Sequence, residues 1–195
     1  MNTISNLAIF ASGNGTNAEA IFKHFENQST IRVKLVLSNS ADSGVLVRAK
    51  RFGIESIVFS KSQFSESNQV VNQLHANQIT HIVLAGFLWL IPKNMIESYV
   101  GKIINIHPAL LPKFGGKGMY GMNVHEAVKL AGETETGITI HEVNEQFDEG
   151  KIIFQASCFV ASTDTPEQIA KKVHTLEYQN YPIVIEEWIK SKVNS

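Results

Sequence analysis

Leu7-Ala8-Ile9-Phe10-Ala11 runs directly into Ser12-Gly13-Asn14-Gly15-Thr16-Asn17, and this passage decides the fold. The first part is a short apolar run with the length and composition of a buried strand. The two glycines that follow permit a tight turn, and a helical pattern extends over about 16–25. The passage therefore predicts a strand, a glycine turn and a helix in succession, which is the opening unit of a parallel α/β sheet.

The same alternation continues along most of the chain. Further strands are predicted at 31–37, 54–59, 81–85 and 102–106, and helices at 45–51, 66–77 and 124–130. Within the second strand, alternation places Val33, Leu35 and Leu37 on one face and Val36 on the other. Strands that are apolar along nearly their whole length indicate a parallel sheet covered by helices on both faces.

The pattern changes after Pro112, where a glycine-rich loop begins. Two longer β segments, 137–143 and 152–160, are expected to be antiparallel. In the last helix Thr165 can cap, Pro166 suits the first position and Gln168 completes a capping box. We therefore expect one α/β domain over residues 1–195, with a mostly parallel sheet, helices on both faces and antiparallel β segments toward the C-terminal half.

Composition and charge narrow the class of protein. The chain has 195 residues, 44% of them hydrophobic and 18% charged, and a net charge of −1, which argues against a broad nucleic-acid-binding surface. Its single cysteine, Cys158, cannot form an internal disulfide and suits a reducing compartment. No apolar run approaches the roughly 20 residues that span a bilayer, and residues 1–5 do not resemble a signal peptide. We expect a cytoplasmic protein without a membrane partner.

The fifth predicted strand ends in Asn105-Ile106-His107-Pro108. Residues i and i+2 of a strand point to the same face, so Asn105 and His107 are expected to aim at one point. An amide donor beside a titratable imidazole is suited to a developing oxyanion. The alternative is a histidine at a strand end that only satisfies the backbone, but the paired asparagine and the rigid prolines favour a catalytic role.

The turn at 12–17 predicts an anion site, because a helix N-terminus offers free N–H groups and a favourable dipole. With Ala18 the turn also fits a loose dinucleotide pattern, but 37–40 lacks the acidic residue that would hold a ribose. No Gly-Lys-Ser/Thr follows, which excludes a P-loop. A phosphomonoester site is the favoured interpretation, and a purely structural turn is the alternative.

Two further stretches have both a functional and an ordinary structural interpretation. Asp148 lies in an acidic turn between the late β segments, where a solvated surface is the ordinary reading, but a carboxylate near His107 could take the proton of an amine nucleophile. Residues 84–92 leave the fourth strand without a polar side chain. Such a run is usually core, yet an apolar loop at a ligand-binding edge suits a flat aromatic ligand.

The sequence contains no motif that indicates a metal site or a covalent nucleophile. His125, His141 and His174 could be combined with His107, but their spacing resembles no zinc motif. No Gly-x-Ser-x-Gly elbow is present, and Cys158 lies within a predicted strand. We therefore expect neither a metal site nor a covalent nucleophile.

Five motifs together carry a family resemblance that runs from the first strand to about Pro182. They lie at 12–17, 83–87, 105–108 with 110–112, 148–150 and 173–177. On these motifs the chain resembles the phosphoribosylglycinamide formyltransferases, folate-dependent enzymes of purine synthesis. The Asn-x-His-Pro element with the later aspartate is typical of formyltetrahydrofolate-using enzymes as a group, and the first and last motifs narrow the resemblance to the glycinamide ribonucleotide branch.

The resemblance implies a Rossmann-like formyltransferase fold and transfer of formyl from the co-substrate 10-formyltetrahydrofolate to the amine of 5-phosphoribosylglycinamide. Attack would be direct, through an oxyanion tetrahedral intermediate, without metal or acyl-enzyme. The implied catalytic residues are Asn105, His107 and Asp148. The implied substrate-binding residues are Gly15, Thr16, Asn17 and Glu177, and those for the folate are Leu88, Trp89, Leu90, Ile91, Asn105, Asn144 and Asp148. The implied partners are these small molecules, without nucleic acid, in a monomer or homodimer.

The chain also departs from the family pattern. Ala109 replaces the common serine after His-Pro, and Lys151 stands where proline often follows the Asp-x-Gly element. The loop 114–123 is longer and richer in methionine than usual. Near Ser67 there is no arginine of the kind that relatives often use for the folate tail, so the tail contacts stay open.

Three rival functions share part of the pattern. Formyltetrahydrofolate hydrolases usually carry an extra N-terminal domain, which we do not expect because the first strand begins by about residue 6. Methionyl-tRNA formyltransferases carry a C-terminal RNA-binding domain, which we do not expect here because one helix follows the last predicted β segment. A catalytically inactive nucleotide- or folate-binding regulator is disfavoured by the intact Asn105, His107 and Asp148.

Overall fold

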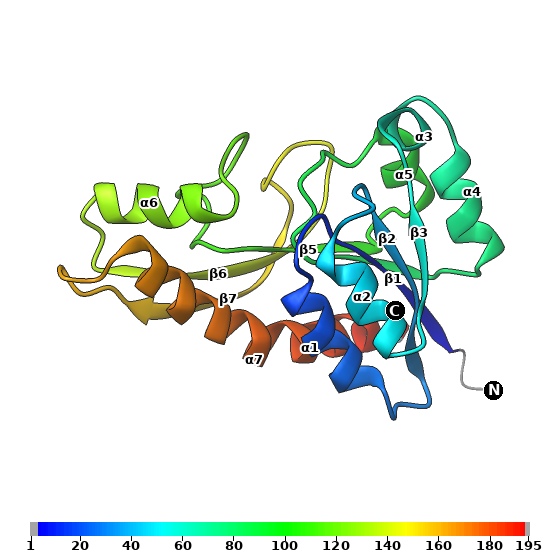
Figure 1. Cartoon of the computed structure of the whole chain (residues 1–195), viewed down its shortest axis with the longest axis horizontal. Coiled ribbons are helices and arrows are strands. Elements are labelled where there is room, and N and C mark those ends of the chain that lie inside the picture. The colour runs from blue at the N-terminus through cyan, green and yellow to red at the C-terminus, as the bar shows by residue number, and fades with distance from the viewer. Residues whose placement is uncertain (1–3, 194–195) are drawn as a thin grey trace.

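The computed structural model describes residues 4–193, which form one seven-stranded sheet. The strands are β1 Ser5–Phe10, β2 Ile31–Ser38, β3 Glu55–Val58, β4 His81–Leu84, β5 Ile103–His107, β6 Glu135–Glu142 and β7 Ile152–Phe159. Their order across the sheet is β3-β2-β1-β4-β5-β6-β7 (Figure 1). β1 to β5 are parallel to one another, whereas β6 pairs antiparallel with both β5 and β7. The expected mostly parallel sheet with antiparallel strands toward the C-terminal half is confirmed.

Helices cover both faces of the sheet, as the sequence predicts. They are α1 Thr16–Phe25, α2 Gly44–Arg51, α3 Lys61–Ser65, α4 Gln69–Ala76, α5 Lys93–Ser98, α6 Met122–Leu130 and α7 Pro166–Val193. One apolar cluster packs α1, α2, α6 and α7 against the sheet, and a second cluster packs α3, α4 and α5 against the opposite face. Within residues 4–193, none of these helices is both long and apolar enough to span a bilayer.

The alternation within β5 decides where its polar side chains lie. Ile104 and Ile106 belong to the cluster under α1 and α7, whereas Ile103 belongs to the cluster under α4 and α5. Because successive side chains of a strand point to opposite faces, Asn105 and His107 share the face of Ile103. The prediction that the amide and the imidazole point to one side is confirmed.

A bulge in β2 overturns one prediction about faces. The register between β1 and β2 shifts by one residue, and Lys34 has no partner on β1. Because one extra residue reverses the alternation, Val33 packs into the same cluster as Val36, while Leu35 and Leu37 pack into the other. The expectation that Val33 shares a face with Leu35 and Leu37 is therefore wrong.

The segment between β3 and β5 also differs from the prediction. The single helix expected at 66–77 is replaced by α3 and α4, separated by three residues. Ser60 begins α3 with a capping box, in which Ser60 N donates to Gln63 Oε1 at 2.7 Å and Gln63 N donates to Ser60 Oγ at 3.3 Å. This cap starts a helix earlier than the apolar periodicity indicates. α5, which follows Pro92, is only six residues long and was not anticipated.

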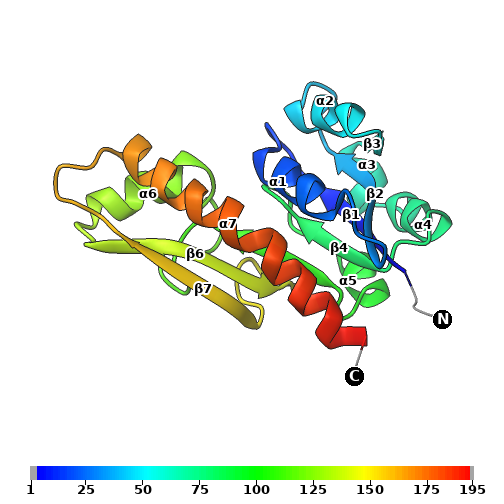
Figure 2. The ribbon, with the colours of Figure 1, turned by 90° about the horizontal axis from the view of Figure 1, so that it is seen from below.

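The long helix α7 starts beside α6 and runs along the sheet (Figure 2), and near its C-terminal end the ring of Trp188 contacts His81 at the start of β4. The predicted capping box is present, since Thr165 N donates to Gln168 Oε1 at 2.8 Å and Gln168 N to Thr165 Oγ1 at 3.3 Å. Tyr181 of α7 is fully buried, and its hydroxyl lies 2.9 Å from Leu84 O and 3.3 Å from Ile104 O. These contacts attach α7 to the end of β4 and to Ile104 within β5.

Candidate active site

Three of the predicted segments meet at the carboxyl ends of the parallel strands. Leu84, the last residue of β4, lies opposite Asn105, and β5 continues for two more residues to His107. The turn after β1 contacts the segment after β4, because Ser12 N donates to Gly86 O at 3.0 Å and Leu88 N donates to Ser12 Oγ at 3.1 Å. This edge of an open α/β sheet is the usual place for ligands.

His107 is held between the loop after β5 and the acidic turn after β6. Its Nε2 donates to Phe114 O at 2.7 Å, and its Nδ1 lies 3.5 Å from Asp148 Oδ2. Asp148 also accepts a hydrogen bond from the backbone N–H of Gly116 at 3.0 Å. The structure thus brings together His107 and Asp148, which are distant in sequence, and joins both to the glycine-rich loop.

His141 is a member of this cluster that the sequence singled out only as a rejected metal ligand. It lies on β6 directly opposite Asn105, and Asn105 Nδ2 is 3.1 Å from His141 Nε2. His141 Nδ1 lies 2.9 Å from Glu142 O, to which it donates, so Nε2 is left to accept from the amide of Asn105. The same Nε2 is 3.6 Å from Asp148 Oδ1. Only the register between β5 and β6 could have predicted the contact between His141 and Asn105, and the sequence does not show this register.

The electrostatic surroundings set the charge of the two central groups. Burial lowers the pKa of His107, and the nearby Asp148 carboxylate only partly offsets this effect. Burial alone would raise the pKa of Asp148, but its contacts with His141, His107 and the backbone N–H of Gly116 together hold that pKa below its ordinary value. At neutral pH the pair is therefore a neutral imidazole beside a carboxylate.

At the other end of the site, the start of α1 meets α7. Asn17 Nδ2 donates to Glu177 Oε2 at 3.0 Å, and Asn17 Oδ1 is buried without a hydrogen-bond partner. Burial raises the pKa of Glu177 to about 7, although the hydrogen bond from Asn17 opposes the shift. Gly15 precedes α1 at φ 75°, and α1 has no side-chain cap, so the N–H groups of its first turn are free of such a partner. The four residues expected to bind substrate thus lie at one place.

The apolar segment after β4 divides into an exposed and a buried part. Leu88 and Leu90 are 45% and 42% exposed. Trp89 points the other way, and its ring contacts those of Phe59, Phe64 and Phe87. Ile91 is buried in the same cluster, against which Val143 also packs. Asn144, which follows Val143, accepts a hydrogen bond from Gln146 N at 3.0 Å and so starts the turn that leads to Asp148.

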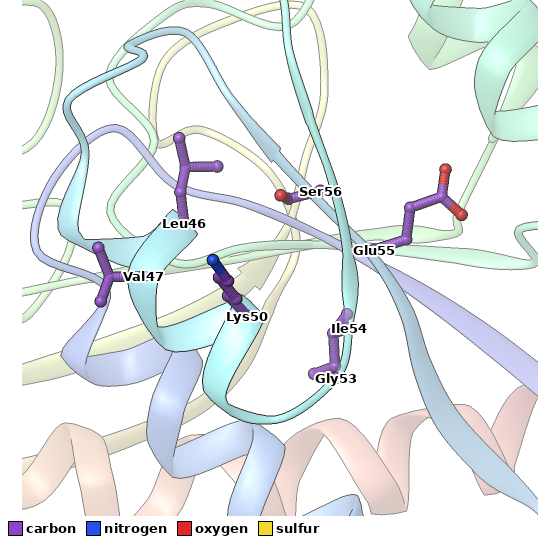
Figure 3. Close-up of a pocket in the computed structure, with 7 residues that line it drawn as sticks. All are labelled: Leu46, Val47, Lys50, Gly53, Ile54, Glu55 and Ser56. Carbon is purple, nitrogen blue, oxygen red and sulfur yellow. The ribbon is translucent and has the colours of Figure 1, made fainter.

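Two hollows of the surface are not lined by the three catalytic candidates. One of about 580 Å³ lies between α2 and β3 and is lined by Leu46, Val47, Lys50, Gly53, Ile54, Glu55 and Ser56 (Figure 3). The other, of about 310 Å³, is lined by Leu110, Leu111, Pro112, Lys113, Phe114, Glu133, Glu135 and Thr136. Neither lining includes Asn105, His107 or Asp148. Among residues 4–193, no group of three or more His, Cys, Asp or Glu side chains is arranged to hold a metal ion.

The sheet order, the Asn-x-His-Pro strand end and the aspartate beside it define an α/β protein with a polar side-chain cluster at the carboxyl edge of its parallel strands. The chain belongs to the formyl transferase family, whose model matches residues 5–185. The family resemblance seen in the sequence is thereby confirmed.

Individual relatives make the comparison more specific. The chain is 40% identical over 185 residues to the chloroplastic phosphoribosylglycinamide formyltransferase of Arabidopsis thaliana, covering 92% of this chain and 63% of that protein. It is 36% identical to the phosphoribosylglycinamide formyltransferase of Bacillus subtilis, with 92% of both chains covered. The chain thus spans less than two thirds of the plant relative but nearly all of the bacterial one.

Solved structures agree with these relatives. The crystal structure of glycinamide ribonucleotide transformylase 1 from Geobacillus kaustophilus has a TM-score of 0.85 and 34% identity, covering 93% of this chain and 96% of that one. Phosphoribosylglycinamide formyltransferase from Streptococcus pneumoniae gives a TM-score of 0.84 at 32% identity, with 95% and 99% covered. The sheet order and the helices on both faces are therefore those of this group of enzymes.

Proposed function

We propose that this protein transfers the formyl group of 10-formyltetrahydrofolate to the amine of 5-phosphoribosylglycinamide, a step of purine (IMP) biosynthesis. The observation that carries the proposal is the meeting of Asn105, His107 and Asp148 at the strand edge, beside the turn that begins α1. The similarity to enzymes of this name supports the choice of substrates. Residues 1–195 would act as one catalytic domain.

Asn105 and His107 would stabilise the oxyanion that forms when the amine attacks the formyl carbon. Both offer N–H donors on one face of β5, and a buried, preorganised donor acts on developing charge without reorganising. The Nε2 proton of His107 is directed at Phe114 O. A formyl oxygen that takes the place of this carbonyl would receive the same hydrogen bond, so binding of the folate and movement of the loop after β5 would be coupled.

Asp148 would carry the proton that the reaction moves. The attacking amine forms a new C–N bond and must lose a proton, while the bond from carbon to N10 of the folate breaks and N10 gains one. Because its pKa lies below the ordinary value, Asp148 is ionised at neutral pH and can accept the proton. The backbone N–H of Gly116, which donates to Asp148 Oδ2 at 3.0 Å, would orient the carboxylate between His107 and His141, which lie 3.5 and 3.6 Å away.

The phosphate and sugar of the substrate would bind where α1 meets α7. The free N–H groups at Gly15, Thr16 and Asn17 suit a phosphate at a helix N-terminus. The unpartnered Oδ1 of Asn17 and the carboxyl group of Glu177 offer acceptors for ribose hydroxyls. A buried acceptor without a partner costs free energy, which a sugar hydroxyl would recover on binding.

The pterin would bind between the segment 88–91 and the turn 144–148. Leu88 and Leu90 offer exposed apolar side chains, Trp89 and Ile91 anchor the segment from behind, and Asn144 begins the facing turn. For the anionic tail we propose Lys61, whose Nζ lies 5.0 Å from the centre of the Trp89 ring. No carboxylate within residues 4–193 forms an ion pair with this lysine.

The proposal includes a monomer or homodimer that acts on small molecules in a reducing, cytoplasmic compartment. The free thiol of Cys158 agrees with such a compartment. Plant relatives named as chloroplastic indicate that location varies among these enzymes.

Incubation of the pure protein with 10-formyltetrahydrofolate, with and without 5-phosphoribosylglycinamide, tests the proposal. We expect deformylation of the folate only when the acceptor is present, with one formylated acceptor per folate consumed. Equal deformylation in both reactions would make the protein a hydrolase. Binding of the folate without any turnover would make it a regulator.

A further inference from the structure

Arg48 of α2 contacts the glycine turn that follows β1. Its Nε donates to Asn14 O at 2.7 Å, and its Nη2 lies 3.3 Å from Asn14 Oδ1. Its Nη1 forms an ion pair with Glu19 of α1, and the side chain is 22% exposed. The guanidinium is therefore fixed between α2 and the first turns of α1, with each of its three nitrogens in contact with Asn14 or Glu19.

Each carbonyl of the turn from residue 13 to residue 15 has a partner within the protein. Val45 N donates to Gly13 O at 3.2 Å, and Glu19 N donates to Gly15 O at 2.9 Å. The carbonyl of Asn14, between them, has Arg48 as its partner. Because the C=O and N–H of a trans peptide point in opposite directions, an Asn14 carbonyl turned toward α2 leaves the N–H of Gly15 turned away from α2.

Rotation of the peptide between Asn14 and Gly15 would turn the N–H of Gly15 away from its present direction. Glycine populates positive and negative φ about equally, so the peptide plane between Asn14 and Gly15 can rotate with little steric cost in the backbone. A rotated plane would put the carbonyl of Asn14 where the N–H of Gly15 had been. A bound anion would then meet the negative end of a peptide dipole in place of a donor.

We propose that Arg48 is a positioning residue for the phosphate of the substrate. By holding the carbonyl of Asn14, it keeps the N–H of Gly15 directed into the mouth of α1, where the phosphate binds. Arg48 acts through the turn and is not itself a phosphate ligand, because Glu19 and Asn14 occupy its guanidinium. This inference rests on the proposed function, which places the phosphate at that turn.

Steady-state kinetics of Arg48→Ala test the inference. Loss of a hydrogen bond from a charged donor is expected to raise KM for 5-phosphoribosylglycinamide and the inhibition constant of inorganic phosphate about tenfold. The KM for 10-formyltetrahydrofolate, and kcat/KM for the glycinamide riboside that lacks the phosphate, should not change. Arg48→Lys should give an intermediate loss, because an ammonium lacks the fork that reaches two partners. Arg51→Ala, an exposed arginine of the same helix, is the matched control and should behave as the wild type.

The amide signal of Gly15 in ¹⁵N NMR separates this inference from the proposed function. In the wild type the signal should shift on titration with inorganic phosphate, and in Arg48→Ala or Arg48→Lys the shift should weaken. A shift of equal size and midpoint in all three proteins would overturn the role of Arg48 while leaving the phosphate site intact. No shift in the wild type would overturn the phosphate site itself. An equal rise of KM for both substrates in Arg48→Lys would reduce Arg48 to a general folding role.

Discussion

The two ends of the candidate site are built in different ways. At the phosphate end, backbone packing fixes the turn: a Cβ added at Gly15 would lie 2.6 Å from Val45 Cβ. At the catalytic end, polar side chains from separate segments meet, with His107 3.5 Å from Asp148 and Asn105 3.1 Å from His141. Close packing against α2, together with the contacts of Arg48, holds the first end, whereas hydrogen bonds and charge alone hold the second. The phosphate end should therefore be sensitive to added volume, and the catalytic end to the loss of a polar group.

The largest effect is expected from His107→Ala at the catalytic end. Removal of one oxyanion donor typically costs about 10²–10³ in kcat. Because His107 is not expected to hold the pterin, binding of tetrahydrofolate should remain close to that of the wild type. Single-turnover kinetics and calorimetric titration measure the two quantities, and His75→Ala, on α4, is the control. Normal turnover by the His107 variant would remove this residue from the mechanism.

At the phosphate end, Gly15→Ala should have the next largest effect. The new Cβ must sit at φ 75° and collide with Val45, so either the turn or α2 has to move. We expect a loss of stability of about 1–3 kcal/mol and a rise of at least about tenfold in KM for 5-phosphoribosylglycinamide. Gly13→Ala is the matched control, since a Cβ there meets nothing within 4 Å. Equal KM values for the two variants would show that packing against α2 does not hold the turn.

Glu177 lies at the phosphate end, but the expected effect of replacing it depends on pH and not on added volume, because its pKa is raised to about 7. Burial raises its pKa from 4.5 to about 7, so the stability it contributes is present below pH 4.5 and is lost as the pH rises to about 7. Glu177→Gln should therefore be more stable than the wild type at pH 8, by on the order of 2–3 kcal/mol, and similar to it at pH 4.5. Thermal unfolding at the two pH values measures this, and a difference independent of pH would contradict it.

The smallest effect is expected at the margin of the pterin site. Lys61→Ala should raise KM for 10-formyltetrahydrofolate by about two- to fivefold, the range of an exposed ion pair, and leave KM for the analogue without glutamate unchanged. Lys93→Ala is the control, because Lys93 is equally exposed and lies 3.8 Å from Glu97. If both lysine variants raise KM for the two folates alike, the tail does not bind at Lys61.

Local patterns were sufficient wherever the structure depends on neighbours in sequence. The apolar run before the glycine turn gave β1 and α1, and the alternation at Asn105 and His107 correctly placed both side chains on one face of β5. The capping box at Thr165 and Gln168 likewise marked the start of α7. Each of these depends on residues at most a few positions apart.

Predictions failed or were missing where structure depends on register or on distant packing. The bulge at Lys34 reversed the side on which Val33 packs, and nothing in the residue types of β2 indicates it. His141 lies in the catalytic cluster because it pairs with Asn105. The packing of the whole sheet, and not the sequence of β5 or β6 alone, selects this register over one that is shifted by a residue. The contact between Asn17 and Glu177 depends on how α7 lies over α1, which the sequence of neither helix determines.

Tyr181 fixes the position of α7 relative to β4 and β5. Its hydroxyl reaches the carbonyl of Leu84 at the end of β4 and that of Ile104 within β5, the two strands that lead into the catalytic end. Glu177 lies one helical turn earlier on α7, so the same side of the helix carries both residues. Tyr181 thereby sets the distance between Glu177, where we propose that the ribose binds, and β5, where we propose that the reaction takes place, although it is not expected to contact either substrate.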